Sequence, residues 1–179
     1  MSKLETNIIA PSTGTTITLG ESGDTVALGS GATQTGFGEN NRPAFYVTMG
    51  AQSVSTGGYT KLQFGTEIID TDNAYDNSTN YRFTVPAEKA GMYYFTTMAQ
   101  SGNLDTAERG QIVFSVSGSR KDETMARNYS PATNQGVFTT ASSVLNLSVG
   151  DYVEVYYLHT EGASMDVGYG QFGGFKIIT

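Results

Sequence analysis

Gly91-Met92-Tyr93-Tyr94-Phe95-Thr96-Thr97-Met98 is the stretch that decides the fold. Successive side chains of a strand point to opposite faces, so Tyr93 and Phe95 share one face, while Tyr94 and the two methionines share the other. A solvated face of an antiparallel sheet is normally polar. Both faces of this strand are therefore expected to be at least half buried.

A second stretch, Tyr152-Val153-Glu154-Val155-Tyr156-Tyr157-Leu158, has the same property. Its two valines and Tyr157 lie on one face, whereas Tyr152, Tyr156 and the leucine lie on the other. One face of each strand can meet an opposing sheet, and the other needs a loop, an appendage or a neighbouring subunit. We favour the neighbouring subunit, with Tyr94, Tyr152 and Tyr156 as candidate interface residues.

The composition of the whole chain agrees with an all-β fold. The 179 residues suit one domain with a short appendage. With 22 Gly, 11 Tyr, 9 Phe and only 15% charged residues, the chain is too aromatic for disorder and too poor in helix formers for a helical protein. The formal charge of −7 argues against nucleic-acid binding. The chain has no cysteine and one histidine, His159, so it has no disulfide framework and no zinc site built on several His or Cys ligands. It contains no run of 18 apolar residues, so no membrane span is predicted.

Short strand patterns separated by turn clusters follow one another from Pro43 onward, and no segment predicts a helix. Such spacing is typical of a sandwich or jelly roll. Gly91 and Gly150 are expected at turns with positive φ that deliver the chain into strands. The expected strands are 44–49, 59–64, 67–70, 81–85, 91–99, 111–117, 124–129, 137–147, 152–159 and 171–178.

Residues 1–42 differ in composition from the rest, being rich in Gly, Ser and Thr with a single aromatic residue. Thr16-Ile17-Thr18-Leu19-Gly20 recurs nine residues later as Thr25-Val26-Ala27-Leu28-Gly29, and each copy alternates like a strand. Two short strands cannot hold together alone. The segment is therefore predicted to be a stem that winds with other copies or docks on another protein, and a flexible linker is the alternative. We place the domain boundary before Pro43, giving units 1–42 and 43–179.

Five short motifs follow one another in the second unit. In chain order they are Pro43-Ala44-Phe45, the segment 75–86, Ala90-Gly91-Met92-Tyr93-Tyr94-Phe95, the segment 143–153, and Phe172-Gly173-Gly174-Phe175 followed by Ile177 and Ile178. Their order over residues 43–179 resembles the C1q/TNF-like jelly-roll domain. The resemblance implies a non-enzymatic, ten-stranded, all-β jelly-roll sandwich that assembles as a homotrimer. It also implies that Phe172 and Phe175 lie in the core or near the threefold axis, which adds Phe172 to the interface candidates.

The first unit departs from animal members of that family. It has no collagen-like Gly-X-Y stalk, and residues 1–7 carry no apolar signal segment. Residues 11–20 instead resemble stems in structural proteins of tailed bacteriophages. Together the two resemblances imply a bacteriophage virion protein, made in the host cytoplasm, that serves as a capsid decoration, head fibre, tail fibre or spike. Residues 1–42 would contact other virion proteins, and the head would bind a surface or stabilise the particle. The alternative is a free, soluble, glycan-binding recognition protein.

An acidic segment is the candidate metal site. Asp70, Asp72 and Asp76 supply hard oxygen ligands at a density that suits calcium. The spacing is not that of an EF-hand, and a solvated acidic loop is the competing interpretation. No other cofactor is expected.

Single residue types suggest two further kinds of chemistry, acid–base catalysis and glycan binding. His159 could serve as a base for Ser142, Ser143 or Ser164, but no Gly-x-Ser-x-Gly elbow accompanies it, so no catalytic residue is assigned. Glycan binding suits tyrosines near predicted loops, although these side chains could equally line a subunit interface or fill the edges of the head. The candidates are Tyr59, Tyr75, Tyr81, Tyr129 and Tyr169.

Overall fold

The computed structural model describes residues 9, 11–25, 27, 30–31 and 41–177. Contacts divide the chain into two units, residues 1–38 and 39–179. Within the described residues, no helix has the length and hydropathy that a membrane crossing requires.

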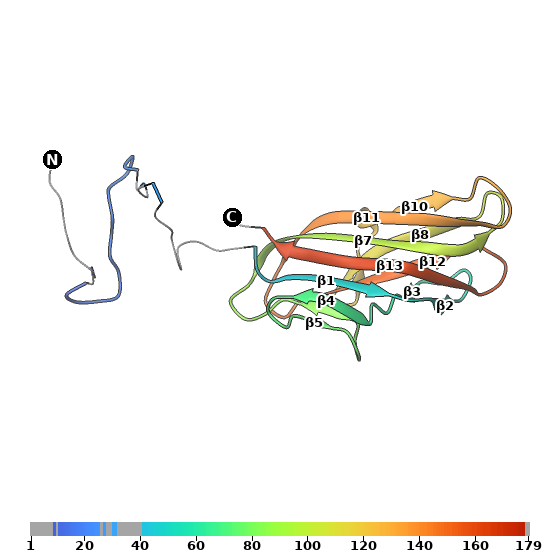
Figure 1. The fold of residues 1–179 in the computed structure, drawn as a ribbon, viewed down its shortest axis with the longest axis horizontal. Helices are drawn as coiled ribbons and strands as arrows, with labels where there is room; N and C mark the ends of the chain where they lie inside the picture. Colours follow the sequence, from blue (N-terminus) through green and yellow to red (C-terminus); the bar gives the residue numbers. More distant parts are fainter. Residues whose placement is uncertain (1–8, 10, 26, 28–29, 32–40, 178–179) are drawn as a thin grey trace. The chain divides into compact units, whose positions relative to one another are not determined.

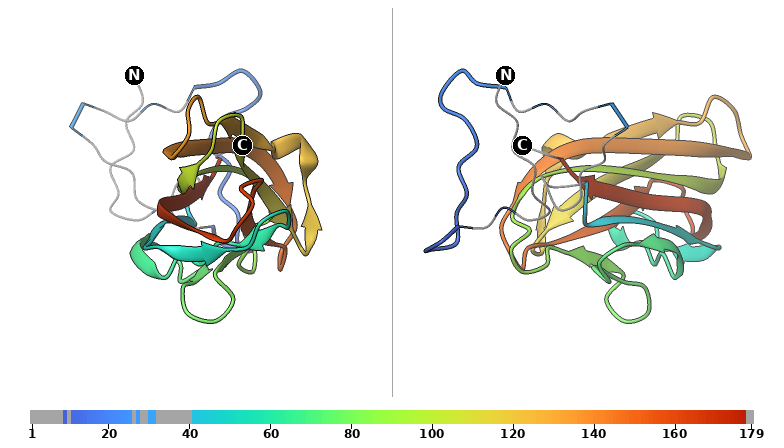
Figure 2. Two further views of the ribbon diagram at one scale, coloured as in Figure 1. Left: turned by 90° about the vertical axis from the view of Figure 1, so that its right-hand side faces the viewer. Right: turned by 60° about the vertical axis from the view of Figure 1, so that its left-hand side comes forward.

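The second unit is a sandwich of two antiparallel sheets (Figure 1). In the described residues, sheet A has six strands, namely β11 (Gln135–Leu147), β7 (Gly91–Leu104), β13 (Met165–Lys176), β1 (Ala44–Met49) and β4 (Thr66–Asp70) in spatial order, with β2 (Gln52–Val54) beside β13. Sheet B has seven, namely β10 (Ala126–Tyr129), β8 (Arg109–Val116), β12 (Tyr152–His159), β6 (Arg82–Thr84) and β5 (Tyr75–Asp76), with β3 (Thr60–Lys61) beside β12 and β9 (Ser119–Arg120) beside β8. Figure 2 shows the two layers from other directions.

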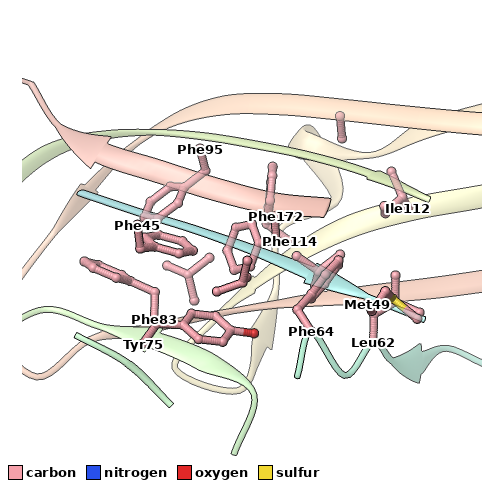
Figure 3. Packing of buried hydrophobic residues seen from close by; sticks show 14 of the residues in the cluster. Phe45, Met49, Leu62, Phe64, Tyr75, Phe83, Phe95, Ile112, Phe114 and Phe172 are labelled. Carbon is pink, nitrogen blue, oxygen red and sulfur yellow. The ribbon is translucent and has the colours of Figure 1, made fainter. Parts of the chain in front are cut away.

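Aromatic rings fill the space between the sheets (Figure 3). Phe45 stacks on Phe83 with 5.0 Å between ring centroids and meets Phe172 edge-on at 4.9 Å. Phe95 and Phe114 lie against Phe172 as well. Such pairs add to the free energy gained by removing the rings from water. The alternation predicted for residues 91–98 is confirmed, because Tyr93 and Phe95 are fully buried in this core while Tyr94 is only half buried.

The predicted all-β jelly roll is confirmed, and the predicted strands 44–49 and 152–159 match the observed bounds. Several very short strands, β2, β5 and β9, were not predicted. The segment predicted as strand 124–129 instead begins with a 3-10 turn, η1 (Asp122–Thr124), and continues as β10. The hydroxyl and amide of Thr124 both bond to the Lys121 carbonyl, which closes that turn before the strand begins.

The first unit is described only in part. Residues 16–19 form no strand in the single chain, and the second repeat has residues 26, 28 and 29 outside the described set. The amide of Glu21 donates to Asp24 Oδ2 at 2.8 Å, which forms a local turn at the glycine-rich bend. Ile17 and Leu19 are 41% and 54% exposed.

We predict that Gly150→Val lowers the free energy of unfolding by about 1–3 kcal/mol, because a β-branched residue is strained at positive φ. Gly150 ends the turn before β12 with φ of +83°, and a Cβ there would meet no atom within 4 Å, so the cost is conformational rather than steric. The matched control is Gly162→Val, at an equally open glycine without positive φ. Thermal melts of both variants check this, and equal melting temperatures would contradict the strain argument.

Candidate functional site

A row of apolar side chains crosses the outer face of sheet A. Val144 on β11 lies opposite Tyr94 on β7, which lies opposite Phe175 on β13. The Tyr94 and Phe175 rings are 5.6 Å apart. Val144 is 48% exposed and Phe175 is 38% exposed. These side chains therefore lie side by side across three strands, and no segment among the described residues covers them.

Further apolar residues extend this row. Met92 precedes Tyr94 on the same face of β7, and Ile69 on β4 pairs with Tyr46 on β1. Tyr46 leans over Gly173 and donates its hydroxyl proton to Gln171 at 2.8 Å. We call the set Tyr46, Ile69, Met92, Tyr94, Val144 and Phe175 the apolar face. An exposed apolar patch that spans five strands is unusual for a monomer and typical of an interface.

The outer face of sheet B is built differently, because its tyrosines lie against charged side chains. Arg82 lies 4.0 Å over the Tyr152 ring, and the Tyr156 hydroxyl is 3.4 Å from Glu154, which pairs with Lys61 at 3.1 Å. Tyr152 and Tyr156 are thus on the face opposite Tyr94, and the three predicted interface residues do not form one surface.

The prediction that Phe172 belongs to the interface is wrong. Its side chain is fully buried between the two sheets of one protomer, in contact with Phe45 and Phe95 (Figure 3). The strand alternation instead places Phe175 outside. Val144 and Ile69, which sequence reasoning missed, alternate as strand residues do, but alternation alone does not say which phase faces the core.

Asp70 shapes the acidic loop from its start. Its carboxylate accepts the amide protons of Ala74 at 3.0 Å and Tyr75 at 2.8 Å, and that of Asp72 at 3.3 Å. The Asp72 carboxylate points to the Thr71 hydroxyl at 2.5 Å and Arg42 Nε at 3.2 Å. These two bonds lower the pKa of Asp72, the Thr71 hydroxyl contributing most.

Asp76 organises the next turn in the same way. Oδ1 accepts the amide protons of Ser78 and Thr79 at 3.1 and 2.9 Å, and Oδ2 accepts both the backbone and side-chain N–H groups of Asn80. The bonds from Thr79 and Ser78, then those from Asn80, hold the pKa of Asp76 far below its usual range. Among the described residues, no three Asp, Glu or His side chains gather as a metal site would require. The three carboxylates are separate acceptors for loop groups, so the geometry gives no support to the calcium prediction.

His159 is fully buried, and its Nε2 lies 2.9 Å from the Val54 carbonyl oxygen. Among the described residues its Nδ1 has no hydrogen-bond partner. Ser142, one predicted nucleophile, lies on the outer face of sheet A, opposite Thr96. The structure therefore does not bring the proposed base and this serine together.

The predicted glycan-binding tyrosines fall into different settings. Tyr75 is buried and stacks on Phe45 at 5.2 Å, and burial raises the pKa of its hydroxyl. Tyr129 and Tyr169 are 50% and 79% exposed. Tyr59 is half buried on sheet B, where the Arg120 guanidinium lies 4.4 Å over its ring. Tyr81 is half buried at a positive φ of 49°. Of the five, burial removes Tyr75 alone as a ligand contact.

Two antiparallel sheets with this strand order define a jelly roll of the C1q/TNF class. A model of the C1q domain matches residues 44–177, and the chain belongs to the C1q domain family. The globular domain of zebrafish complement 1qA is similar in structure, with a TM-score of 0.58, 20% identity, and coverage of 76% of this chain and 98% of that one.

Eiger TNF from S. frugiperda is similar with a TM-score of 0.56 and 13% identity, covering 76% of this chain and 94% of that one. Murine APRIL, in its structure at pH 5.0, is similar with a TM-score of 0.56 and 14% identity, covering 75% of this chain and 98% of that one. No curated protein matches the sequence significantly. These structural likenesses establish the fold.

We predict that Asp76→Asn lowers the melting temperature at pH 7, because an amide replaces one of two oxygens that accept loop N–H groups. The depressed pKa of Asp76 determines the pH dependence. The ionised carboxylate makes its whole contribution to the free energy of unfolding above about pH 4, and this contribution is lost as the pH falls through the folded-state pKa. The difference in melting temperature between wild type and Asp76→Asn should therefore become smaller from pH 5 toward pH 2.

The control is Asp105→Asn, at an exposed carboxylate that accepts no hydrogen bond among the described residues. Melting curves with and without millimolar calcium complete the experiment. A calcium-dependent rise in the wild type that Asp76→Asn removes would contradict the loop-shaping role and restore the metal prediction.

Proposed function

We propose that residues 43–179 form a non-enzymatic trimeric head, in which the apolar face packs against neighbouring copies. The apolar face is the observation that carries this proposal, because Tyr94, Val144 and Phe175 lie side by side on a sheet face that no described segment covers, with Val144 48% and Phe175 38% exposed. Domains of the C1q/TNF family are typically trimers, which supports a second copy rather than an unrelated partner as the occupant.

The contrast between the two outer faces supports the same choice. On sheet B, Val113 is fully buried although it alternates away from the core residues Ile112 and Phe114, and the Arg120 guanidinium lies over the Tyr59 ring on that face. No described segment covers the apolar face of sheet A in this way. Burying large side chains that are 40–50% exposed would release a further share of their transfer free energy, of roughly 1.5–3 kcal/mol per fully buried residue.

We further propose that residues 1–42 attach the head to a virion. This proposal is supported by the repeated apolar pattern, in which Ile17 and Leu19 are exposed, and by the resemblance of residues 11–20 to phage stems. A short apolar stripe cannot order some thirty residues alone, since backbone ordering costs roughly 1–2 kcal/mol per residue. Three stems joined at one head have a high effective concentration, so they can wind around one another or bind cooperatively to a partner surface. A free recognition protein with a glycan ligand is the second candidate.

We predict that Val144→Asp converts the trimer to monomers at micromolar concentration, because three carboxylates would be buried without partners. Val149→Asp is a matched control: Val149 is 52% exposed against 48% for Val144, but it lies in the loop after β11, off the apolar face. Light scattering coupled to size exclusion should give a mass near three chains for wild type and control. A monomeric wild type, or a trimeric Val144→Asp variant, would refute the interface.

We predict that deleting residues 1–40 leaves a folded trimeric head that no longer joins particles. The measurement is co-sedimentation of full-length and truncated protein with particles that lack it. Loss of sedimentation on truncation supports stem attachment. Equal sedimentation would mean that the stem is not the anchor, and a protein that never sediments but keeps its ligand would favour the free recognition protein.

A further inference from the structure

A small pocket lies on the outer face of sheet B, whereas the apolar face belongs to sheet A. It is lined by Tyr59, Ser115, Gly118, Arg120 and Tyr156. We call it the Tyr59–Tyr156 pocket. Its volume is about 190 Å³, below the roughly 300–1,000 Å³ typical of sites for drug-sized ligands. It therefore fits a ligand of about one ring.

Both aromatic walls are held in place by neighbouring side chains. The Tyr59 hydroxyl accepts a hydrogen bond from Gln111, which is 96% buried. The Arg120 guanidinium covers one face of the Tyr59 ring at 4.4 Å. On the other wall the Tyr156 hydroxyl lies 3.4 Å from Glu154, itself buried and paired with Lys61. A ligand would thus meet walls whose rotamers are already fixed, which lowers the entropic cost of binding.

Ser115 adds a polar group to the pocket. It is 1% exposed, lies on the outward-facing side of β8 and lines the pocket. A serine hydroxyl both donates and accepts hydrogen bonds, so a ligand hydroxyl entering the pocket would find a partner there.

Arg120 is oriented but not saturated. Asp122 accepts from its Nε and Nη2 atoms at 2.5 and 3.2 Å, which occupies one edge of the guanidinium and leaves the Nη1 protons for another acceptor. The same pairing balances the charge of Arg120. A neutral oxygen-rich ligand suits this edge better than an anion, which would compete with Asp122 in a chain of net charge −7.

We propose that the Tyr59–Tyr156 pocket binds one neutral hexopyranose unit of a glycan. A pyranose ring has a face of C–H groups, which packs on the electron-rich face of an aromatic ring, and an edge of hydroxyls, which can bond to Ser115 and Arg120. This inference rests on the second candidate function, glycan recognition by the head, and it gives that function a ligand class and a place. Because the pocket is on sheet B, a trimer built on sheet A leaves it open.

The test uses the full chain, with backbone amide chemical shifts as the readout. The neutral probes are the methyl glycosides of glucose, galactose, mannose and N-acetylglucosamine, and the acidic probe is the methyl glycoside of glucuronic acid. At least one neutral glycoside should shift the amides of residues 115–120, with a dissociation constant on the order of millimolar for a single ring. Tyr59→Ala should weaken binding about tenfold, and Ser115→Ala, the milder change, several-fold. Tyr129→Ala, at a 50% exposed tyrosine on the same sheet, is the control and should bind as wild type.

Three results would overturn the proposal: no neutral glycoside shifts these amides, only the glucuronide does, or binding survives both pocket variants. Light scattering on the same samples separates this inference from the proposed assembly. A monomer that binds the sugar would refute the trimer and keep the pocket, and a trimer that binds no sugar would do the reverse.

Discussion

The close approach of core side chains to the backbone of β13 is the constraint on which the sandwich depends. A Cβ atom at residue 174 would lie 2.5 Å from Cδ1 of Phe95, and one at residue 170 would lie 2.6 Å from Cγ of Met49. Both glycines face inward on either side of Phe172, so side chains from neighbouring strands can close around that ring. Larger residues would push these side chains away and open the packing that a dense interior requires.

The same strand then determines what its other side presents. Because side chains alternate, an inward Phe172 and Gly174 place Phe175 outside, where it meets Tyr94 at 5.6 Å. The outward Gly173 leaves room over which the Tyr46 ring leans. The core packing and the apolar face are therefore two consequences of one short motif, Phe172-Gly173-Gly174-Phe175, and a slip of one residue would exchange them.

Residue alternation predicted the fold well because it is a local property. It gave the strands 44–49 and 152–159 and the opposite directions of Tyr93 and Tyr94. The resemblance, which gave Phe172 and Phe175 one joint placement, did not separate them, whereas alternation along β13 puts Phe172 inside and Phe175 outside. The cover that Tyr59 and Arg120 form over sheet B joins residues sixty positions apart, and the use of Asp70 and Asp76 as loop acceptors depends on turn geometry. Neither arrangement has a signature in spacing or composition, so neither could be predicted from the sequence.

The two outer faces of the sandwich are chemically suited to different partners. Sheet A offers stacked apolar side chains with few polar demands, which suits a rigid, self-complementary surface. Sheet B offers tyrosines held by hydrogen bonds and by a guanidinium, with Ser115 and Arg120 beside them in a small hollow, which suits a small polar ligand. With the apolar face used for assembly, three copies of the pocket would point away from the shared axis. Weak single-site binding then becomes useful, because a surface carrying many glycans can engage several pockets of one head at once.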